Sequence, residues 1–410
     1  MNLSQFNNVI PSSLLDRIAV EYDVDRCNHI RLPGQAVFAC LLDAMLNHGE
    51  VSLRVLEETY QRRTGLTADH SSFGKRLGTI SPQYFRAIFE FLYDQLSPTI
   101  KPGEAKALRI RRIDATTVIL SAKLIGFGHL YTNTGQTRTG QGHRSIKSVF
   151  SLTEEGLPSF LRLAIAREEN SDVKALGRAL REHARPNDLW VFDAGCHDRN
   201  VMLALHQAKA YFLTPHSTQT LNIDQVVQQT PPEELLSSDP GKQSAHFQVV
   251  RVETAAFGNH ADKKKWQQMP LVVVQGLRWD LRTKQWKPMT LMTNLPLSAD
   301  GTRAGLFTFE EVGDIYRRRW EIESFFKFIK QHLGFEHIIS RTLTGIEVMI
   351  YMSLIAALLM IWYQRVTRID RGWKAVKIWL SGDAQEWAQD LLFDAMDIRL
   401  RKPKRYRRAV

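Results

Sequence analysis

The sequence predicts a mixed α/β protein whose core is interrupted by a β-rich insertion and preceded by an all-helical N-terminal domain. Residues 1–104 show short amphipathic stretches broken by glycines, with no convincing strand alternation. The apolar run Leu189 to Phe192 is typical of a strand buried on both faces, as in a parallel sheet covered by helices. Residues 221–305 contain alternating runs such as HFQVVRVETA and KPMTLMTNLP, which favour strands.

The chain is longer than one hydrophobic core usually covers, so we expect several units among its 410 residues. The changes of pattern divide it into a helical N-terminal domain, the first part of the core, the β-rich insertion, the second part of the core, and a C-terminal helix with a basic tail. The corresponding boundaries are 1–104, 105–220, 221–305, 306–370 and 371–410.

Composition favours a soluble protein with a polyanionic partner. Apolar residues make up 44% and charged residues 24% of the chain, and the net charge is +11 with a pI near 9.5. Three scattered cysteines are too few for a disulfide framework or a zinc site, which fits a reducing, cytoplasmic setting. The N-terminus lacks the pattern of a signal peptide.

One uncharged apolar run, VMIYMSLIAALLMIWY at residues 348–363, has the composition of a membrane span. It is shorter than the roughly 20 residues that a span requires, and a polar, basic flank follows it. We therefore expect a helix buried inside the protein and no membrane partner.

The helical domain contains a candidate DNA-binding motif. Residues 52–65 and 66–78 are predicted to form helix, glycine turn and short helix, as in a helix-turn-helix. Lys75 and Arg76 on the second helix are candidate DNA contacts, with ordinary helix packing as the alternative. At the other end of the chain, seven Lys and Arg between Arg399 and Arg408 are either a solvated tail or phosphate contacts.

Several elements follow from local patterns in the core. Residues 108–120 and the two halves of 146–165 are predicted strands, the latter joined at a Glu-Glu-Gly turn. Asp198 stands before NVMLALHQAK, where it fits a helix N-cap. Thr308 and Glu311 form a capping pattern for a later helix.

Two aspartates lie at strand positions that favour a functional role. Asp114 lies inside a predicted strand, where Asp is uncommon. Asp193 directly follows LWVF at the carboxyl end of a buried strand, which is where open α/β sheets bind ligands. A turn or cap role for Asp193 is the alternative, but Asp198 already accounts for the cap.

A stretch from residue 316 to 330, YRRRWEIESFFKFIK, places an acidic side chain in a basic row. On one continuous helix Tyr316, Arg319, Glu323 and Lys330 share a stripe about 60° wide. An apolar row beside it would anchor the helix, at Ile315, Ile322, Phe326 and Leu333. Glu321 points away from the stripe and is predicted to be an ordinary surface residue.

The stripe is consistent with a phosphodiester substrate. Tyr, Arg and Lys bind phosphate oxygens, whereas phosphate repels a carboxylate unless a cation lies between them. Asp114, Asp193 and Glu323 on separate elements could hold two Mg²⁺ about 4 Å apart, one activating the attacking oxygen and one stabilising the leaving oxygen. The alternative is a helix on which Arg319 and Glu323 merely pair at i, i+4.

These residues resemble the IS4 family of bacterial DDE transposases. Its Y-(2)-R-(3)-E-(6)-K signature is matched by Tyr316, Arg319, Glu323 and Lys330, and Trp320 follows the arginine as it often does in that family. IDATT resembles the strand of the first aspartate, and LWVFDAGCHD that of the second. The resemblance runs from about residue 105 to 365.

The resemblance implies a ribonuclease-H-like core, a helical domain that helps bind transposon ends, and metal ligands at the two aspartates and Glu323. It implies Mg²⁺, with Mn²⁺ able to substitute, and phosphate or DNA contacts by Tyr316, Arg319, Lys330 and Trp320. The partners would be double-stranded DNA and, in the synaptic complex, a second copy of the chain. The setting would be the bacterial cytoplasm, at the nucleoid.

The implied reaction is hydrolysis at each transposon end to expose a 3′-OH, followed by attack of that 3′-OH on target phosphodiesters; some relatives pass through a hairpin. An aromatic that stacks on a flipped base would be Trp279 or Trp286, for which a place in the sheet core is the alternative. The sequence departs from the family after the second aspartate. There Ala194-Gly195-Cys196 replace the usual Arg-Gly-Tyr, which puts the activity of this copy in doubt.

Two other functions remain open from the sequence. A DNA-binding protein with an inactive core would bind ends without cutting them. A ribonuclease-H-like nuclease without strand transfer would produce nicks but no joined products.

Overall fold

A computed structural model describes most of the chain. The described residues are 8–25, 32–48, 51–97, 108–120, 129–131, 143–196, 198–215, 225–228, 248–252, 256–257, 267–268, 271–280, 283, 285–296, 309–368 and 372–401. The capping residue Thr308, most of the basic tail and the polar stretch 229–247 lie outside them.

The N-terminal third is helical where it is described. Its helices are α2 (Ser12–Glu21), α3 (Gly34–Asn47), α4 (Leu53–Thr64), α5 (His70–Thr79) and α6 (Pro82–Leu96). Ser52 and Asp69 cap α4 and α5 by accepting bonds from backbone N–H groups of Val55 and Ser72. The apolar α3 is buried from Gly34 to Leu46, so it forms the centre of this bundle.

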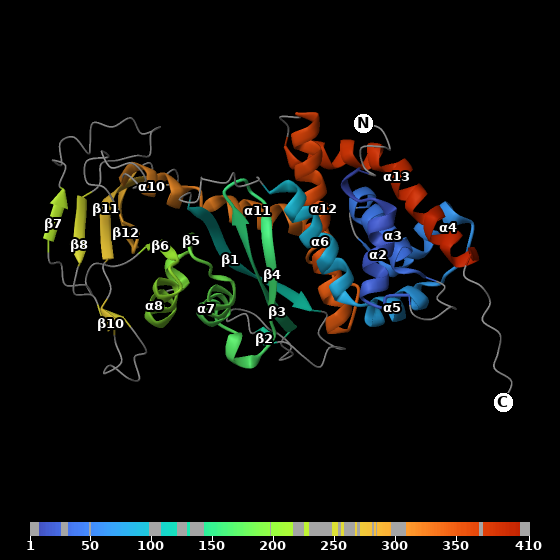
Figure 1. Ribbon diagram of the computed structural model, residues 1–410, viewed down its shortest axis with the longest axis horizontal. Coiled ribbons are helices and arrows are strands. Elements are labelled where there is room, and N and C mark those ends of the chain that lie inside the picture. The colour runs from blue at the N-terminus through green and yellow to red at the C-terminus, as the bar shows by residue number, and fades with distance from the viewer. Residues whose placement is uncertain are drawn as a thin grey trace.

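Two helices from the far end of the chain complete this bundle. α12 (Leu343–Thr367) packs on α3, α5 and α6, and α13 (Trp373–Arg401) packs on α3 and α4. Figure 1 shows both among the N-terminal helices. Their apolar side chains share one buried cluster with those of α2 to α6. The helical unit is therefore built from both ends of the chain, a grouping that the linear division of the sequence does not contain.

The apolar run at 348–363 lies inside α12. The helix is long and apolar enough to span a membrane by length and composition, yet 89% of its most apolar window is buried within the protein. The prediction of a buried core helix is confirmed.

A mixed ten-stranded sheet forms the rest of the scaffold, in the order β2-β3-β1-β5-β6-β12-β11-β8-β7, with β4 also paired to β3. Its strands are β1 (Arg109–Leu120), β2 (His129–Tyr131), β3 (His143–Thr153), β4 (Pro158–Ala164), β5 (Asp188–Val191), β6 (Tyr211–Pro215), β7 (Gln225–Gln228), β8 (Gln248–Val252), β11 (Leu271–Asp280) and β12 (Gln285–Thr293). β3 runs antiparallel to β1, and β5 and β6 run parallel to it and to each other.

The inserted segment continues this sheet. β12 pairs with β6 through Leu291 to Thr293, and β11, β8 and β7 follow outward. A separate short pair is formed by β9 (Ala256–Phe257) and β10 (Gln267–Gln268). The insertion thus extends the sheet away from the helical unit, which contacts the opposite edge through β4 (Figure 1).

Helices cover both faces of the sheet. α7 (Asp172–His183) and α8 (Arg199–Gln207) share a buried cluster with Ile113, Val149 and Trp190. On the other face, α10 (Phe309–Arg317) packs on Ile110 and Leu213, and α11 (Trp320–His332) packs on Phe150. Short 3₁₀ turns, η1 (Arg167–Glu169) and η2 (Ala194–Cys196), precede α7 and α8. Asp198 accepts bonds from the backbone N–H groups of Asn200 and Val201, which confirms its predicted N-cap role.

The stretch 316–330 is not one continuous helix. α10 ends at Arg317 and α11 begins at Trp320, with Arg318 and Arg319 in the turn between them. The backbone N–H groups of Arg319, Glu321 and Ile322 bond to carbonyls three residues earlier instead of four. This tightening keeps the chain near a helical path, so the predicted anchors Ile315, Ile322, Phe326 and Leu333 are all buried.

Candidate active site

β1 presents Asp114 toward α11. Side chains alternate between the two faces of a strand, so Asp114 shares a face with Arg112 and Val118. Val118 belongs to the cluster that includes α11, whereas Ile113 faces α7 and α8. The Asp114 carboxylate accepts a bond from the backbone N–H of Ala115 at 2.8 Å. Burial raises the pKa of Asp114 to about 6, with nearby Glu323 adding to the shift and Arg319 opposing it.

Glu323 and Asp114 meet at one guanidinium. Arg319 Nη2 lies 2.6 Å from Glu323 Oε1, and Arg319 Nη1 lies 3.9 Å from Asp114 Oδ2. The Arg319 side chain is 8% exposed. Its burial lowers the pKa of the guanidinium, but the charges of Tyr316, Glu323 and Asp193 outweigh that effect and raise it. The i, i+4 pair that the sequence offered as an alternative is therefore present, but it also reaches the aspartate of β1.

Asp193 lies just beyond the end of β5, the strand that runs parallel to β1. The register pairs Arg112 with Val191; Asp114 follows two residues later within β1, and Asp193 follows Val191 by two residues. Asp193 is exposed, and its Oδ1 accepts a bond from the backbone N–H of Ala194 at 2.7 Å. Its negative charge helps to raise the pKa of Arg319, so it lies near the guanidinium that Glu323 and Asp114 approach.

The donor set fits a hard divalent cation, because such cations prefer carboxylate oxygens. Among the described residues, no three His, Cys, Asp or Glu side chains are close enough to hold a metal ion as they stand. Arg319 pairs closely with Glu323 and more weakly with Asp114, at 2.6 Å and 3.9 Å. Cation binding requires these side chains to rotate away from the guanidinium.

The other signature residues surround this centre. The Arg319 guanidinium lies 5.9 Å from the centre of the Tyr316 ring, a cation–π arrangement. Lys330 Nζ is 2.8 Å from Glu336 Oε1 and 3.5 Å from the carbonyl oxygen of Thr117 on β1. Trp320 is 62% exposed at the start of α11. All four signature side chains therefore lie along the side of α10 and α11 that faces β1, with Trp320 projecting into solvent.

Glu321 corrects the sequence interpretation. Its Oε2 lies 3.0 Å from Nη1 of Arg112, whose side chain is 1% exposed, and its Oε1 accepts a bond from Arg318 Nε at 2.8 Å. Glu321 is therefore the partner of a buried arginine, and the prediction of an ordinary surface residue is wrong. The helical angle could not reveal this, because the partner lies on a strand about 200 residues earlier in the chain.

The helix-turn-helix candidates differ in their surroundings. Lys75 is exposed on α5. Arg76 donates to the carbonyl oxygens of Leu32 and Val24 and to Asp25, at 2.8 to 2.9 Å. These contacts favour the packing alternative for Arg76, while DNA contact by Lys75 stays a prediction. Trp279 and Trp286 pair in backbone register on β11 and β12, but their side chains lie outside what the structure describes.

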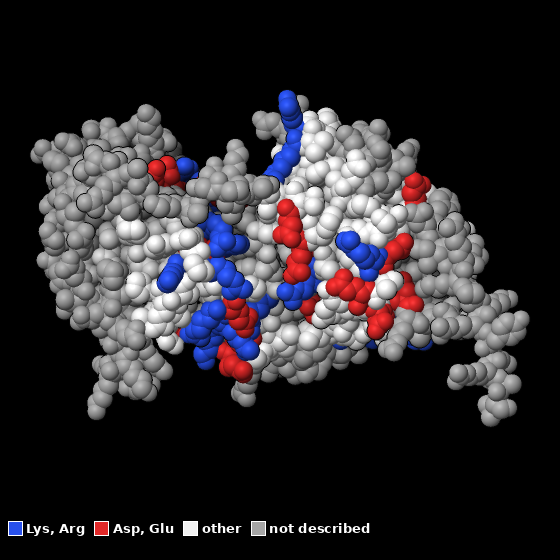
Figure 2. All heavy atoms as spheres, in the orientation of Figure 1, with Lys and Arg blue, Asp and Glu red and all other residues white. Residues whose placement is uncertain are grey.

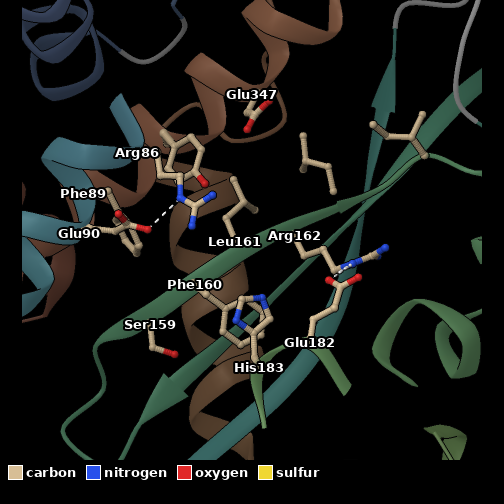
Figure 3. A pocket seen from close by; sticks show the side chains of 13 residues that line it. Arg86, Phe89, Glu90, Ser159, Phe160, Leu161, Arg162, Glu182, His183 and Glu347 are labelled. Carbon is tan, nitrogen blue, oxygen red and sulfur yellow. Dashed lines mark hydrogen bonds and ion pairs between the residues drawn. The ribbon is translucent and has the colours of Figure 1, made fainter. Parts of the chain in front are cut away.

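A cavity of about 450 Å³ lies elsewhere, between α6, β4, α12 and the end of α7 (Figure 3). Arg86 pairs with Glu90 there, and the His183 ring stacks on Phe160 at 3.9 Å. Two arginines, three glutamates and a histidine lie in its lining, and none of the predicted site residues belongs to it. The carboxylate centre, and not this cavity, is the candidate active site.

Comparison with known proteins identifies the family of the chain. The sequence model of the Transposase DDE domain family matches residues 107–359. A putative transposase for insertion sequence element IS4SA of Synechocystis sp. (strain PCC 6803) is 34% identical over 70 residues, which is 17% of this chain and 20% of that relative. The match thus spans about a fifth of the relative's length.

Among solved structures, the piggyBac transposase synaptic complex with hairpin DNA aligns with 90% of this chain and 73% of its own. At 13% identity and a TM-score of 0.45, that likeness is too distant to define the fold here. The family match covers more than half of the chain and contains all three carboxylates. The chain therefore belongs to the family of DDE transposases, as its IS4-type signature indicates.

Proposed function

We propose that this protein is the DNA transposase of an insertion sequence, which binds terminal inverted repeats and catalyses metal-dependent phosphodiester hydrolysis and strand transfer. The observation that supports this most directly is the meeting of Asp114 and Glu323 at Arg319, with Asp193 just beyond the end of the neighbouring strand β5. A buried Asp in a strand, with its pKa raised by burial, is costly to the fold and is typical of functional sites.

The sheet supports a ribonuclease-H-like core. Its inner part has the order β4-β3-β1-β5-β6, in which an antiparallel β1-β3-β4 unit is joined to the parallel strands β5 and β6. In this proposal the first aspartate lies on the central strand and the second follows its parallel neighbour. The glutamate comes from a helix that packs across the first.

Asp114, Asp193 and Glu323 would hold the divalent cation, and Mg²⁺ is the expected ion because it prefers carboxylate oxygens. When bound, it supplies positive charge at the scissile phosphate. The chain's own cations do the positioning. The Nε of Arg319 is buried and has no hydrogen-bond partner among the described residues, so it would donate to a phosphate oxygen only once the side chain turns outward.

Lys330 and Tyr316 extend the same row. A phosphate that draws Arg319 away from Glu323 would free that carboxylate for the cation, so substrate and cation binding would favour each other. The DNA ends would be held by two copies of the chain in the bacterial cytoplasm. Stacking of a flipped base on Trp279 or Trp286, and a hairpin route, stay predictions.

A cleavage assay tests the proposal. The substrate is a linear duplex carrying the DNA that flanks this gene on both sides, incubated with Mg²⁺, Mn²⁺ or EDTA. We expect strand cuts at the ends of the inverted repeats with either metal and none in EDTA, together with products joined to a target plasmid. Binding without cuts in either metal would instead support an inactive DNA-binding relic. Cuts without joined products would support a nuclease.

A further inference from the structure

A second charged contact between β1 and α11 lies beside the carboxylate centre. Arg112 precedes Asp114 by two residues on β1, and Glu321 precedes Glu323 by two residues on α11. Arg112 Nη1 donates to the carbonyl oxygen of Thr153 at 2.9 Å and lies 3.0 Å from Glu321 Oε2. This pair therefore joins β1 to α11 two residues before Asp114 on the strand and two residues before Glu323 on the helix.

Glu321 also fixes the turn between α10 and α11. Its other oxygen, Oε1, accepts a bond from Arg318 Nε at 2.8 Å. Arg318 Nη2 in turn donates to the carbonyl oxygen of Glu154, in the turn that joins β3 to β4. One carboxylate thus bridges two guanidinium groups that reach three segments: β1, the β3–β4 turn and the bend itself.

The placement of Glu323 depends on this bend. The backbone bonds of residues 319, 321 and 322 span three residues, so the helical ladder is irregular immediately before Glu323. A ladder of this kind resists bending less than a regular α-helix. An external anchor at Glu321 removes that freedom, and Arg112 is a strong anchor because a buried guanidinium is costly without its partner.

We propose that Glu321, held by Arg112 and Arg318, is a positioning residue that sets the distance between Glu323 and Asp114. The role rests on the proposed function, in which those two carboxylates hold a divalent cation. Glu321 itself touches neither cation nor DNA in this account. Groups that orient metal ligands typically change metal affinity or activity by about 10-fold to 100-fold when they are altered.

The test compares Glu321→Gln with Asp314→Asn, which removes an exposed pair with Arg317 on the adjoining helix. The primary readout is Mn²⁺ binding to the DNA-free protein, followed by the paramagnetic resonance signal of free Mn²⁺. We expect the dissociation constant to rise about 10-fold in Glu321→Gln and to stay within about twofold in Asp314→Asn. Binding of the flanking duplex in EDTA should change in neither variant.

A double variant separates positioning from folding. Arg112→Met combined with Glu321→Met removes both charges, so no buried guanidinium is left unpaired and thermal stability should recover toward wild type. If Glu321 positions Glu323, the Mn²⁺ affinity of this double variant should stay low although its stability recovers. Recovery of wild-type Mn²⁺ affinity in the double variant, or unchanged affinity in Glu321→Gln, would overturn the proposal.

These outcomes are distinct from failure of the transposase function. Wild-type protein that binds Mn²⁺ through Glu323 but cuts no DNA would contradict the proposed function, and the Mn²⁺ comparison would still decide the role of Glu321. Wild-type protein whose Mn²⁺ binding is the same as that of Glu323→Gln would contradict both.

Discussion

One guanidinium serves carboxylates on separate elements at the centre of the site. Arg319 lies 2.6 Å from Glu323 and 3.9 Å from Asp114, and the charge of Asp193 acts on it as well. The positive charge of Arg319 offsets the repulsion between these carboxylates while no cation is bound. The arrangement also means that Asp114, which lacks a short contact to the guanidinium, bears most of the cost of burial.

That cost gives a stability prediction for Asp114. Because burial raises its pKa to about 6, the charged form is disfavoured in the folded protein. Asp114→Asn should therefore abolish cleavage yet raise the thermal midpoint of the metal-free protein at pH 7.5. The matched change is Asp188→Asn. Asp188 is fully buried and accepts bonds from Arg109 and Arg111, so its substitution should destabilise by about 3 kcal/mol. Calorimetry of both variants in EDTA tests the contrast, and a lower midpoint in Asp114→Asn would contradict it.

The same shift predicts a pH dependence. The pKa of Asp114 in the folded protein, about 6, lies above its usual value near 3.8. Its contribution to the free energy of unfolding is therefore fully present below about pH 3.8 and is lost as pH rises through about 6. The advantage of Asp114→Asn should therefore vanish by about pH 4. Mn²⁺ affinity of the wild type should fall below pH 6, because protons compete for the ligand. Titration of both quantities from pH 4 to 8 measures this, and affinity that is flat across pH 6 would argue against Asp114 as a ligand.

Residue-scale prediction from the sequence selects side chains that are unusual for their local surroundings: an Asp in a strand, an Asp after a strand end and a Glu in a basic row. The structure brings Asp114 and Glu323 to Arg319, and the charge of Asp193 acts on the same guanidinium. Prediction from the sequence failed for Glu321, whose partner Arg112 comes from a distant strand. Helical angle describes only the helix itself, so a pairing across elements leaves no trace in the sequence of either one.

At the scale of elements, the bend between α10 and α11 and the packing of α12 determine how α11 is held in place. α12 begins against α5: Thr342 caps it, and a Cβ at Gly345 would lie 2.0 Å from Ser340 Oγ and 3.0 Å from the carbonyl oxygen of Leu77. α11 in turn rests on α13, where Phe328 stacks on Trp373 at 4.6 Å and Lys377 donates to the carbonyl oxygen of His332. A disturbance in either terminal helix would therefore reach α11.

Two glycines test this packing. Gly345→Ala should destabilise the protein, because the added methyl group meets backbone as well as a side chain. Gly382→Ala on α13 meets nothing within 4 Å and should stabilise by up to about 1 kcal/mol, since Ala favours helix over Gly. Thermal midpoints of the two variants measure the difference. Equal shifts in the same direction would show that the contact at the start of α12 is not tight.

Hydrophobic periodicity in the sequence predicted these helices and strands but not the connections between them. The strands of the β1–β3–β4 unit, the strand before Asp193 and the buried helix at 348–363 follow from alternation and apolar runs. The bend at Arg318 and Arg319 does not, because no Gly or Pro marks it. Ion pairs to other segments lie at the bend instead: Glu321 pairs with Arg112, and Arg318 pairs with Glu154.

Across the whole molecule, both ends of the chain build one helical unit. Arg63 on α4 pairs with Asp43 on α3 at 2.6 Å, and its other bonds go to Gln385 and Gln389 on α13. Trp387 of α13 is fully buried in the same cluster. A division made along the sequence could not show this, because helix period indicates that a face is buried but not which helix covers it.

The surface also carries a testable charge pattern. Lys174, Arg178 and Arg181 are exposed on one side of α7, at i, i+4 and i+7, and the start of α7 contacts the turn after Asp193. Figure 2 shows Lys and Arg gathered with Asp and Glu over the position that α7 has in Figure 1. In the proposed function, we expect this row to contact a DNA backbone on the sheet face that α7 covers.

Lys174→Ala combined with Arg181→Ala should weaken binding of the flanking duplex in EDTA. If both residues contact phosphates, the slope of log affinity against log salt should fall by about 2. Glu182→Gln, which frees Arg178 of one partner on the same helix, should not weaken binding. A salt slope unchanged by the double substitution would show that these side chains are solvated and do not contact DNA.

The central claim is that the carboxylate of Glu323, and not merely the fold around it, is required to cut DNA. The most direct measurement is the rate of strand cleavage on the flanking duplex by wild type and Glu323→Gln with Mg²⁺, after equal duplex binding in EDTA has been shown for both. We expect retained binding and a cleavage rate lower by at least about 100-fold, since an essential charge interaction contributes several kcal/mol. Cleavage by Glu323→Gln at the wild-type rate would contradict it.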